Sequence, residues 1–370
     1  MSDPLLKVRN LHGYFPTAAG AAKVLNGIDI SVDKGNTVAL VGESGCGKSV
    51  TMKSIMGLLS PPEIQIPEGE IRFRDKNLLE ASNKERRALR GSDIGMILQD
   101  PMTSLNPVFT IGEQMIDVLK WQHKDQVSIL DYVYDKFRNH DDLKENALDM
   151  LERVQISSPE RVFSSYPHEL SGGMRQRVLI AITFLSEPDL LIADEPGTAL
   201  DVTTESKILD LFNEVIEETN TSVLYVTHDL GVARKVSDYT YVMYAGEIVE
   251  NAPTKTLFDD PQHPYSRGLL ESIPKLAGGI GDGIDGQLPD YTDPPSACRF
   301  VDRCPFAAEE CREVYPYQRE VDPNHGVACH LFDGVPTYER DTAKDYPPVE
   351  IGTAPWDDTQ GTNPTPKSEQ

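Results

Sequence analysis

The chain has 370 residues, of which 39% are hydrophobic, and it carries 59 acidic against 35 basic side chains for a formal net charge of −24. This length is enough for two domains with real cores. The acidic balance argues against nucleic acid as the main partner, because neutralising phosphates needs a basic surface.

The acidic side chains are spread along the whole chain, as in proteins of salt-loving microbes. A carboxylate-rich surface keeps a protein in solution where salt screens charge heavily. The composition therefore predicts a halophilic source, namely a halophilic archaeon. The alternative is an ordinary acidic cytosolic protein with an acidic tail.

Apolar runs in the sequence are short. Residues 1–7 lack the apolar core of a signal peptide, and the longest apolar run, residues 178–185, falls far below the roughly 20 residues that span a bilayer. We expect a cytoplasmic protein that does not itself form a membrane pore.

Residues 5–41 alternate apolar and polar side chains, which predicts an antiparallel β-layer. Tyr14 and Phe15 lie near the end of its first strand. An aromatic ring at this place can stack on an adenine, and core packing is the alternative interpretation for either residue.

The motif that organises the chain follows this layer. Residues 42–49 read G-x-x-x-x-G-K-S, between a predicted buried strand at 37–41 and a predicted helix at 50–56. The glycines let backbone N–H groups turn toward phosphate oxygens, and the helix N-terminus adds partial positive charge. Lys48 is expected to reach the β- and γ-phosphates and Ser49 to bind Mg²⁺. The motif predicts nucleoside triphosphate binding, with a chance glycine-rich turn as the alternative.

Strands and helices alternate after the motif. Strands are predicted at residues 69–74, 94–99, 189–193 and 222–227, with helices at 84–90, within 111–177 and at 203–219. Residues 122–143 fit neither pattern. The alternation predicts a mostly parallel α/β core interrupted by a helical insertion.

Polar side chains end three of these predicted strands. Because ligands bind at the carboxyl ends of parallel strands, we expect them to meet at the phosphates. Asp194 would hold Mg²⁺, and Glu195 would act as general base toward the attacking water. His228 would contact the γ-phosphate, and Gln99 would bind Mg²⁺ and the water.

The region after residue 257 has a different texture. Prolines break long elements, residues 278–286 read as a linker, and residues 333–370 read as a disordered acidic tail. Four cysteines fall between them: Cys298, Cys304, Cys311 and Cys329. In a reducing compartment such a cluster favours a metal or cofactor over disulfides.

Six motifs in order resemble those of ABC transporter ATPases: residues 42–49, 99–101, 170–174, 190–195, 198–201 and 227–229. The resemblance spans residues 5–255. It implies a P-loop ABC cassette of the α/β class, with a mixed RecA-like core sheet, an antiparallel β-layer and a helical subdomain at about 101–185. It also implies a head-to-tail dimer, in which Asp201 couples the two sites.

In such a dimer, one copy's Ser171, Gly172 and Gly173 would close on the γ-phosphate of ATP held by the other copy. The adenine-stacking aromatic aligns with Phe15, with Tyr14 as the alternative. The resemblance implies an ATP site of Phe15, Gly42, Ser44, Gly45, Cys46, Gly47, Lys48, Ser49, Val50, Gln99, Ser171, Gly172, Gly173 and Asp194.

Residues 166–173, 263–270 and 298–305 resemble the oligopeptide/dipeptide importer ATPases. The resemblance implies a C-terminal domain at 256–332 and a peripheral place on the cytoplasmic face of the membrane. Implied partners are two permeases, a second ABC ATPase (the same or a similar chain) and an extracellular binding protein. ATP hydrolysis would drive peptide uptake. Nickel and glycans are alternative cargoes, and a soluble non-transport ABC ATPase or a non-catalytic cassette are rival functions.

Some members of this subfamily carry a [4Fe–4S] cluster in the corresponding region. The four cysteines are therefore expected to bind one. A structural Zn²⁺ or four reduced core thiols are the alternatives, although the spacing lacks the C-x2-C pairs of zinc ribbons.

The composition generates a salt prediction. Salt screens the mutual repulsion of the carboxylates, so the midpoint of thermal unfolding should rise from low to molar KCl, together with ATPase activity. Circular dichroism and phosphate release measure the two effects. Equal folding and activity at low and molar salt would contradict the halophile interpretation.

Overall fold

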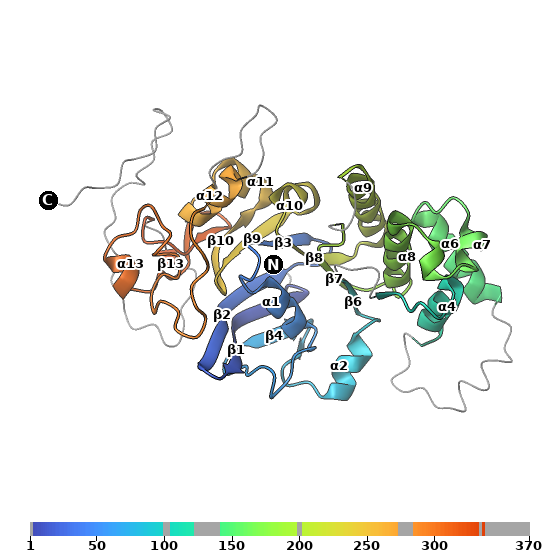
Figure 1. Cartoon of the computed structure of the whole chain (residues 1–370), viewed down its shortest axis with the longest axis horizontal. Coiled ribbons are helices and arrows are strands. Elements are labelled where there is room, and N and C mark those ends of the chain that lie inside the picture. Colours follow the sequence, from blue (N-terminus) through green and yellow to red (C-terminus); the bar gives the residue numbers. More distant parts are fainter. Residues whose placement is uncertain are drawn as a thin grey trace.

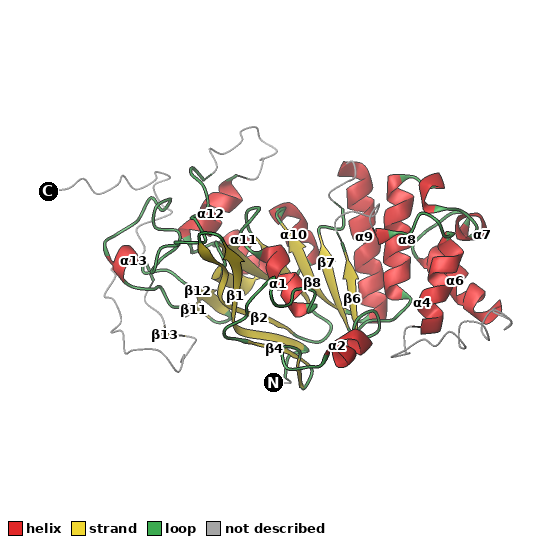
Figure 2. Cartoon of the chain, turned by 60° about the horizontal axis from the view of Figure 1, so that its bottom comes forward, coloured by secondary structure: helices red, strands yellow, loops and turns green. Residues whose placement is uncertain are grey.

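Two β-sheets form the centre of the molecule in the part of the chain that the computed structural model describes, residues 3–98, 104–121, 141–197, 202–272, 284–332 and 335–336. The larger sheet has the strand order β13-β11-β12-β10-β9-β3-β8-β7-β6, and the smaller has the order β2-β1-β4-β5. Helices cover the larger sheet and extend beyond one end of it (Figures 1 and 2).

The strands are β1 (Leu6–Thr17), β2 (Gly20–Val32), β3 (Thr37–Val41), β4 (Glu70–Phe73), β5 (Lys76–Asn77), β6 (Ile94–Ile97), β7 (Leu190–Asp194), β8 (Ser222–Thr227), β9 (Tyr239–Tyr244), β10 (Glu247–Pro253), β11 (Arg319–Asp322), β12 (His325–Val327) and β13 (Val335–Pro336). The helices are α1 (Lys48–Ile55), α2 (Asn83–Leu89), α4 (Ile111–Trp121), α6 (Asp141–Arg153), α7 (Pro159–Phe163), η1 (Pro167–Glu169), α8 (Gly172–Phe184), α9 (Val202–Thr219), α10 (Leu230–Val236), α11 (Thr254–Asp259), α12 (Pro264–Glu271) and α13 (Glu310–Glu313).

The middle of the larger sheet is parallel and buried on both faces. Strand β3 pairs in parallel with β8 and β9, and β7 pairs in parallel with β8 and β6. In β7, Leu190 and Ile192 pack into one apolar cluster, whereas Leu191 and Ala193 pack into another on the opposite face. The continuous apolar runs of these strands arise from this two-sided burial. The predicted parallel α/β core is confirmed.

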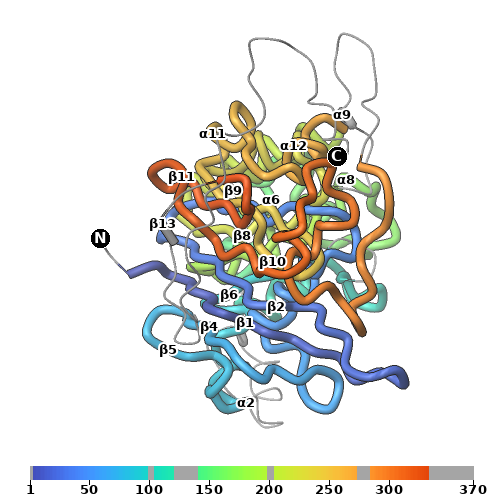
Figure 3. Tube along the Cα trace, turned by 90° about the vertical axis from the view of Figure 1, so that its left-hand side faces the viewer, coloured from blue at the N-terminus to red at the C-terminus, as the bar shows by residue number. Residues whose placement is uncertain are grey.

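The smaller sheet is antiparallel and lies against the core sheet (Figure 3). Leu6, Val8 and Leu11 on β1 are buried, and they share one cluster with Val38 and Leu40 of β3. The alternation of apolar and polar side chains in residues 5–41 arises because one face of this sheet is buried and the other is exposed to solvent. The predicted antiparallel layer is confirmed.

Helices α4, α6, α7 and α8 gather at one end of the molecule, on the far side of α9 from the phosphate-binding motif (Figure 1). Ile111, Met115, Ala147 and Leu151 are all fully buried in one cluster with α8. Their four-residue spacing places each pair on one helix face. The segment 122–143, which fits neither sequence pattern, is described only from Asp141, where α6 begins.

Strands of the C-terminal region continue the larger sheet. Strand β10 pairs with β12, which pairs with β11. The sheet therefore runs without interruption past residue 255, where the cassette was expected to end. Of the expected linker only residues 284–286 are described, and of the expected tail only β13.

A buried carboxylate fixes this continuation. Glu250 of β10 is fully buried and accepts hydrogen bonds from the backbone N–H groups of Gln262 and His263, at 2.7 and 2.8 Å, while His325 Nε2 lies 2.8 Å from its Oε1. Burial lowers the pKa of His263 to about 3, so its ring is neutral, and its Nδ1 accepts a hydrogen bond from the N–H of Tyr265. The start of α12 is thereby tied to β10 and β12.

No helix in the described ranges combines the length and apolarity that crossing a bilayer requires.

Candidate functional site

The phosphate-binding motif forms the turn between β3 and α1. Gly42 and Gly47 have φ values of 155° and 113°, which L side chains rarely adopt. A Cβ at Gly42 would lie 2.2 Å from the carbonyl oxygen of Met243. The helix begins at Lys48, two residues earlier than predicted, because Gly47 caps it in the left-handed conformation. The glycines therefore set the path of the loop.

Lys48 is buried and its ammonium group lies inside the loop. Its Nζ donates hydrogen bonds to the carbonyl oxygens of Gly42 at 2.7 Å and Glu43 at 3.0 Å. The Cys46 side chain is fully buried beside it, with Sγ 3.9 Å from Nζ, and burial raises the pKa of its thiol. The loop thus holds a cation at its centre.

An open cavity of about 630 Å³ surrounds the loop, a size within the range of small-molecule sites. It brings together the loop and the polar ends of β7 and β8, as the sequence predicted. Its lining consists of Val24, Gly42, Glu43, Ser44, Gly45, Gly47, Lys48, Ser49, Val50, Asp194, Glu195, His228 and Leu269.

Three groups with acid–base chemistry meet at one wall of this cavity. Burial, and secondarily the charge of Glu195, raises the pKa of Asp194, while Lys48 opposes the shift. Glu195 Oε1 contacts His228 Nδ1 and accepts a hydrogen bond from the His228 backbone N–H at 3.2 Å. A carboxylate, a second carboxylate and an imidazole are thus placed opposite a lysine and a helix N-terminus.

Other predicted residues do not line the cavity. Phe15 and Tyr14 are partly buried on β1 but are not part of the lining. Ser171 caps α8, with its Oγ 3.4 Å from the N–H of Met174, and neither it nor Gly172 or Gly173 reaches the chain's own cavity. Gln99 and residues 198–201 lie outside the described residues, so their expected roles stay predictions.

Three lining residues were missed by the motif analysis: Val24, Glu43 and Leu269. Glu43 occupies a variable position of the phosphate motif, and Leu269 belongs to the His263–Leu270 block, which was recognised only as a family resemblance. Nothing in the local sequence connects a leucine 220 residues away with the phosphate loop. The one signal in the sequence was the His263–Leu270 block, which belongs to none of the six cassette motifs.

The four C-terminal cysteines lie in one region, and the backbone N–H of Cys298 donates to the carbonyl of Cys311 at 3.1 Å. Burial raises the pKa of Cys298 to about 12 and of Cys304 to about 11, and the pKa of Cys329 is also raised, with the neighbouring thiols contributing. All five cysteines of the chain are free thiols. Within the described ranges no group of three or more His, Cys, Asp or Glu side chains is arranged to hold a metal ion.

Comparison with known proteins places the chain. Residues 25–198 match the ABC transporter family, and residues 249–311 match the oligopeptide/dipeptide transporter C-terminal region. The dipeptide transport ATP-binding protein DppD of Bacillus subtilis is 45% identical over 333 residues, covering 90% of this chain and 96% of the relative. The oligopeptide transport ATP-binding protein OppD of the same organism is 43% identical, covering 89% of each.

Solved structures agree with these matches. The ATP-binding cassette MJ0796, in a dimeric post-hydrolysis state bound to ADP and Pi, superimposes with a TM-score of 0.56 at 26% identity, over 67% of this chain and 98% of that one. The protein cbiO1 of Clostridium perfringens, part of the ABC transporter complex cbiONQ, gives 0.56 at 25% identity, over 70% and 92%. The chain therefore belongs to the ABC transporter ATP-binding family, in the group that carries the oligopeptide/dipeptide transporter C-terminal region.

Proposed function

We propose that this chain is the ATP-hydrolysing subunit of an ABC importer that takes up dipeptides or oligopeptides. The observation that carries the proposal is the meeting of Lys48, Asp194, Glu195 and His228 in one cavity. The names of the 45% and 43% identical relatives supply the substrate class. The intact set of polar groups argues against a non-catalytic cassette, and the match to the peptide-transporter C-terminal region argues against a soluble ABC ATPase.

The residues divide the work of binding by their chemistry. Backbone N–H groups of the loop and the ammonium group of Lys48 would bind the phosphates. The partial positive charge at the N-terminus of α1 would stabilise them further. Ser49 and Asp194 line the same cavity and offer the oxygen donors that Mg²⁺ prefers, with Gln99 as a third. Bound Mg²⁺ would neutralise charge that develops on the phosphates.

Glu195 would accept the proton of the attacking water, since it lines the cavity beside Asp194 and its carboxylate contacts the ring of His228. His228 touches Glu195, so its ring would fix the direction of the carboxylate and reach the γ-phosphate. Phe15, with Tyr14 as the alternative, is proposed to stack on the adenine. Because neither lines the cavity in the single chain, the adenine would lie outside that cavity, toward β1.

The second half of the site is proposed to come from another copy or a similar ATPase. Ser171 and Gly172 are exposed at the N-terminus of α8, where backbone N–H groups and a hydroxyl form an anion-binding surface. They lie apart from the chain's own cavity. A head-to-tail dimer would bring them to the γ-phosphate of the partner's ATP, with Asp201 at the junction.

The proposed membrane contact lies on the helical part of the molecule. Leu98, Val108 and Phe109 flank the undescribed segment around Gln99 and are 41%, 71% and 46% exposed. A contiguous patch of exposed apolar side chains marks an interaction surface, and we propose that these three belong to one. These side chains would contact two permease subunits, which would place this chain peripherally on the cytoplasmic face of the membrane. The contact would also link Gln99 to substrate movement. An extracellular binding protein would select the cargo, with nickel complexes and glycans as the alternatives to peptides.

Glu195→Gln tests the catalytic assignment in the assembled importer. The amide cannot take a proton, so ATP turnover should fall by about 100-fold or more, and ATP-bound dimers should accumulate. Phosphate release, dipeptide uptake into proteoliposomes and size-exclusion chromatography measure this. Glu187→Gln, at an exposed position outside the cavity, is the matched control. Unchanged turnover in Glu195→Gln would show that another group is the base.

We also propose that the four cysteines bind a [4Fe–4S] cluster, with Zn²⁺ as the alternative. The support is the chemistry of the donor set and the gathering of its members: the backbone N–H of Cys298 donates to the carbonyl of Cys311, and Cys298 and Cys304 pack against the same apolar cluster.

Anaerobic purification tests the cluster. Broad visible absorbance and about four irons per chain are expected, and Cys304→Ser should abolish both while Cys46→Ser, in the phosphate loop, leaves them in place. Protein without iron but with one zinc would support the alternative. Protein without either metal would leave reduced core thiols as the answer.

A further inference from the structure

We propose that Arg303, from the C-terminal region, is a positioning residue of the ATP site: it neutralises Glu43 and holds this carboxylate of the phosphate loop away from the incoming phosphates. The inference rests on the proposed function, because it assumes that the cavity binds ATP. It adds to the cassette a residue more than 250 positions away from the loop it serves.

The contact between the two side chains is a paired one. Arg303 Nη1 lies 2.9 Å from Glu43 Oε2, and Nη2 donates to Oε1 at 3.0 Å. The Arg303 side chain is 6% exposed and that of Glu43 is 29% exposed. A guanidinium that meets both oxygens of a carboxylate fixes its orientation as well as its charge, which a lysine cannot do equally well.

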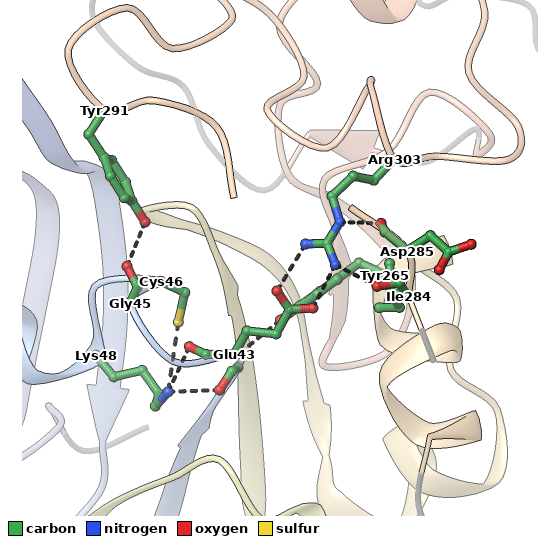
Figure 4. A network of polar contacts seen from close by, with 10 residues as sticks. Glu43, Gly45, Cys46, Lys48, Tyr265, Ile284, Asp285, Tyr291 and Arg303 are labelled. Carbon is green, nitrogen blue, oxygen red and sulfur yellow. Dashed lines mark hydrogen bonds and ion pairs between the residues drawn. The ribbon is translucent and has the colours of Figure 1, made fainter. Parts of the chain in front are cut away.

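The guanidinium is itself held in place by the C-terminal region. It donates hydrogen bonds to the carbonyl oxygens of Ile284 and Asp285 at 2.9 and 2.8 Å (Figure 4). It also lies 5.6 Å from the ring centre of Tyr244. Because these contacts fix Arg303 independently of Glu43, the arginine is a rigid support for the loop and not a side chain that merely follows it.

Two tyrosines hold the same half of the loop. The backbone N–H of Glu43 donates to Tyr265 Oη at 2.9 Å, and Tyr291 Oη donates to the carbonyl of Gly45 at 2.8 Å (Figure 4). The C-terminal region therefore contacts the loop at successive positions, and Lys48 donates to the carbonyl of Glu43 from the opposite side. Glu43 is therefore held by Tyr265, Arg303 and Lys48, while Tyr291 holds Gly45.

The need for the arginine follows from charge. Glu43 lines the cavity, so without Arg303 its carboxylate would be free to turn toward a polyanionic ligand in a partly desolvated site. A carboxylate there repels phosphate unless a fixed cation offsets it. Arg303 supplies that cation from outside the cavity, where it does not obstruct the ligand.

The pairing of Arg303 with Glu43 predicts that removing both charges costs less affinity than removing the arginine alone. Arg303→Ala leaves an unpaired carboxylate beside the phosphates, and the dissociation constant of a fluorescent ATP analogue with Mg²⁺ should rise by about tenfold. The double variant Arg303→Ala with Glu43→Gln removes the charge that needed a partner, and most of the lost affinity should return. Glu43→Gln alone closes the double-mutant cycle.

Binding is measured on the purified full chain, with thermal unfolding recorded for each variant. Arg312→Ala is the control, because it removes an ion pair with Asp302 in the same region whose partners are 59% and 70% exposed. In ATPase assays of the importer, Arg303→Ala should raise KM while kcat stays nearly constant, since Glu195 and His228 are untouched.

Two results would overturn the inference: wild-type affinity in Arg303→Ala, or equal loss in the single and double variants, which would mean that Arg303 is only a structural prop. If Arg303→Ala does not fold, Arg303→Lys decides, since it keeps the charge and should bind more weakly than the wild type but regain affinity with Glu43→Gln. A wild-type chain that binds no ATP analogue would refute the proposed function instead.

Discussion

The site depends on the common register of three parallel strands. Val41 of β3 lies opposite Thr227 of β8, and Val226 of β8 lies opposite Asp194 of β7. The strands therefore end at one level of the sheet, and the residues that follow them emerge side by side. Side-chain packing fixes this register, because a slip by one residue would exchange the side chains of the two apolar clusters on the opposite faces of the sheet. The chemistry of the cavity is thus set by the packing of the core beneath it.

The C-terminal region is part of this arrangement and not an appendage. Its strands continue the core sheet beyond β10, and the buried Glu250 ties β10 to α12 and β12. From this base, residues 284–303 reach the phosphate loop. The match to the oligopeptide/dipeptide transporter C-terminal region thereby gains a physical meaning for this chain: Tyr265, Tyr291 and Arg303 of that region contact the phosphate-binding loop.

The sequence alone predicted the fold class, the two layers and the meeting of Lys48, Asp194, Glu195 and His228, because each has a local signal. Strand 37–41, the glycine spacing and Asp194-Glu195 after an apolar run are all readable within a few residues. Contacts across long sequence separations carry no such signal. No local motif distinguishes Arg303 and Tyr291 from other arginines and tyrosines. Only the folded C-terminal region shows that they contact the phosphate-binding loop. The start of α1 at Lys48 was missed because the helix already includes the last two residues of the phosphate motif, Lys48 and Ser49.

The expected metal site also shows that a sequence pattern does not specify how distant residues are arranged in space. Spacing and composition singled out the four cysteines, yet the convergence of ligands depends on turns that spacing does not specify. Burial, and secondarily the neighbouring cysteines, raises the pKa of the Cys298 and Cys304 thiols. Both thiols are therefore protonated at neutral pH. Metal binding would have to displace those protons.

The central claim is that one chain carries half of an ATP site and that a second cassette supplies the other half. It is tested most directly by a crosslink between two differently tagged copies, one with Ser44→Cys and the other with Ser171→Cys, both at exposed positions. With MgATP bound to a Glu195→Gln background, a short bismaleimide should join the two tags, and neither variant alone should give this product. A mixed dimer that forms with MgATP but never crosslinks at these positions would contradict the shared site.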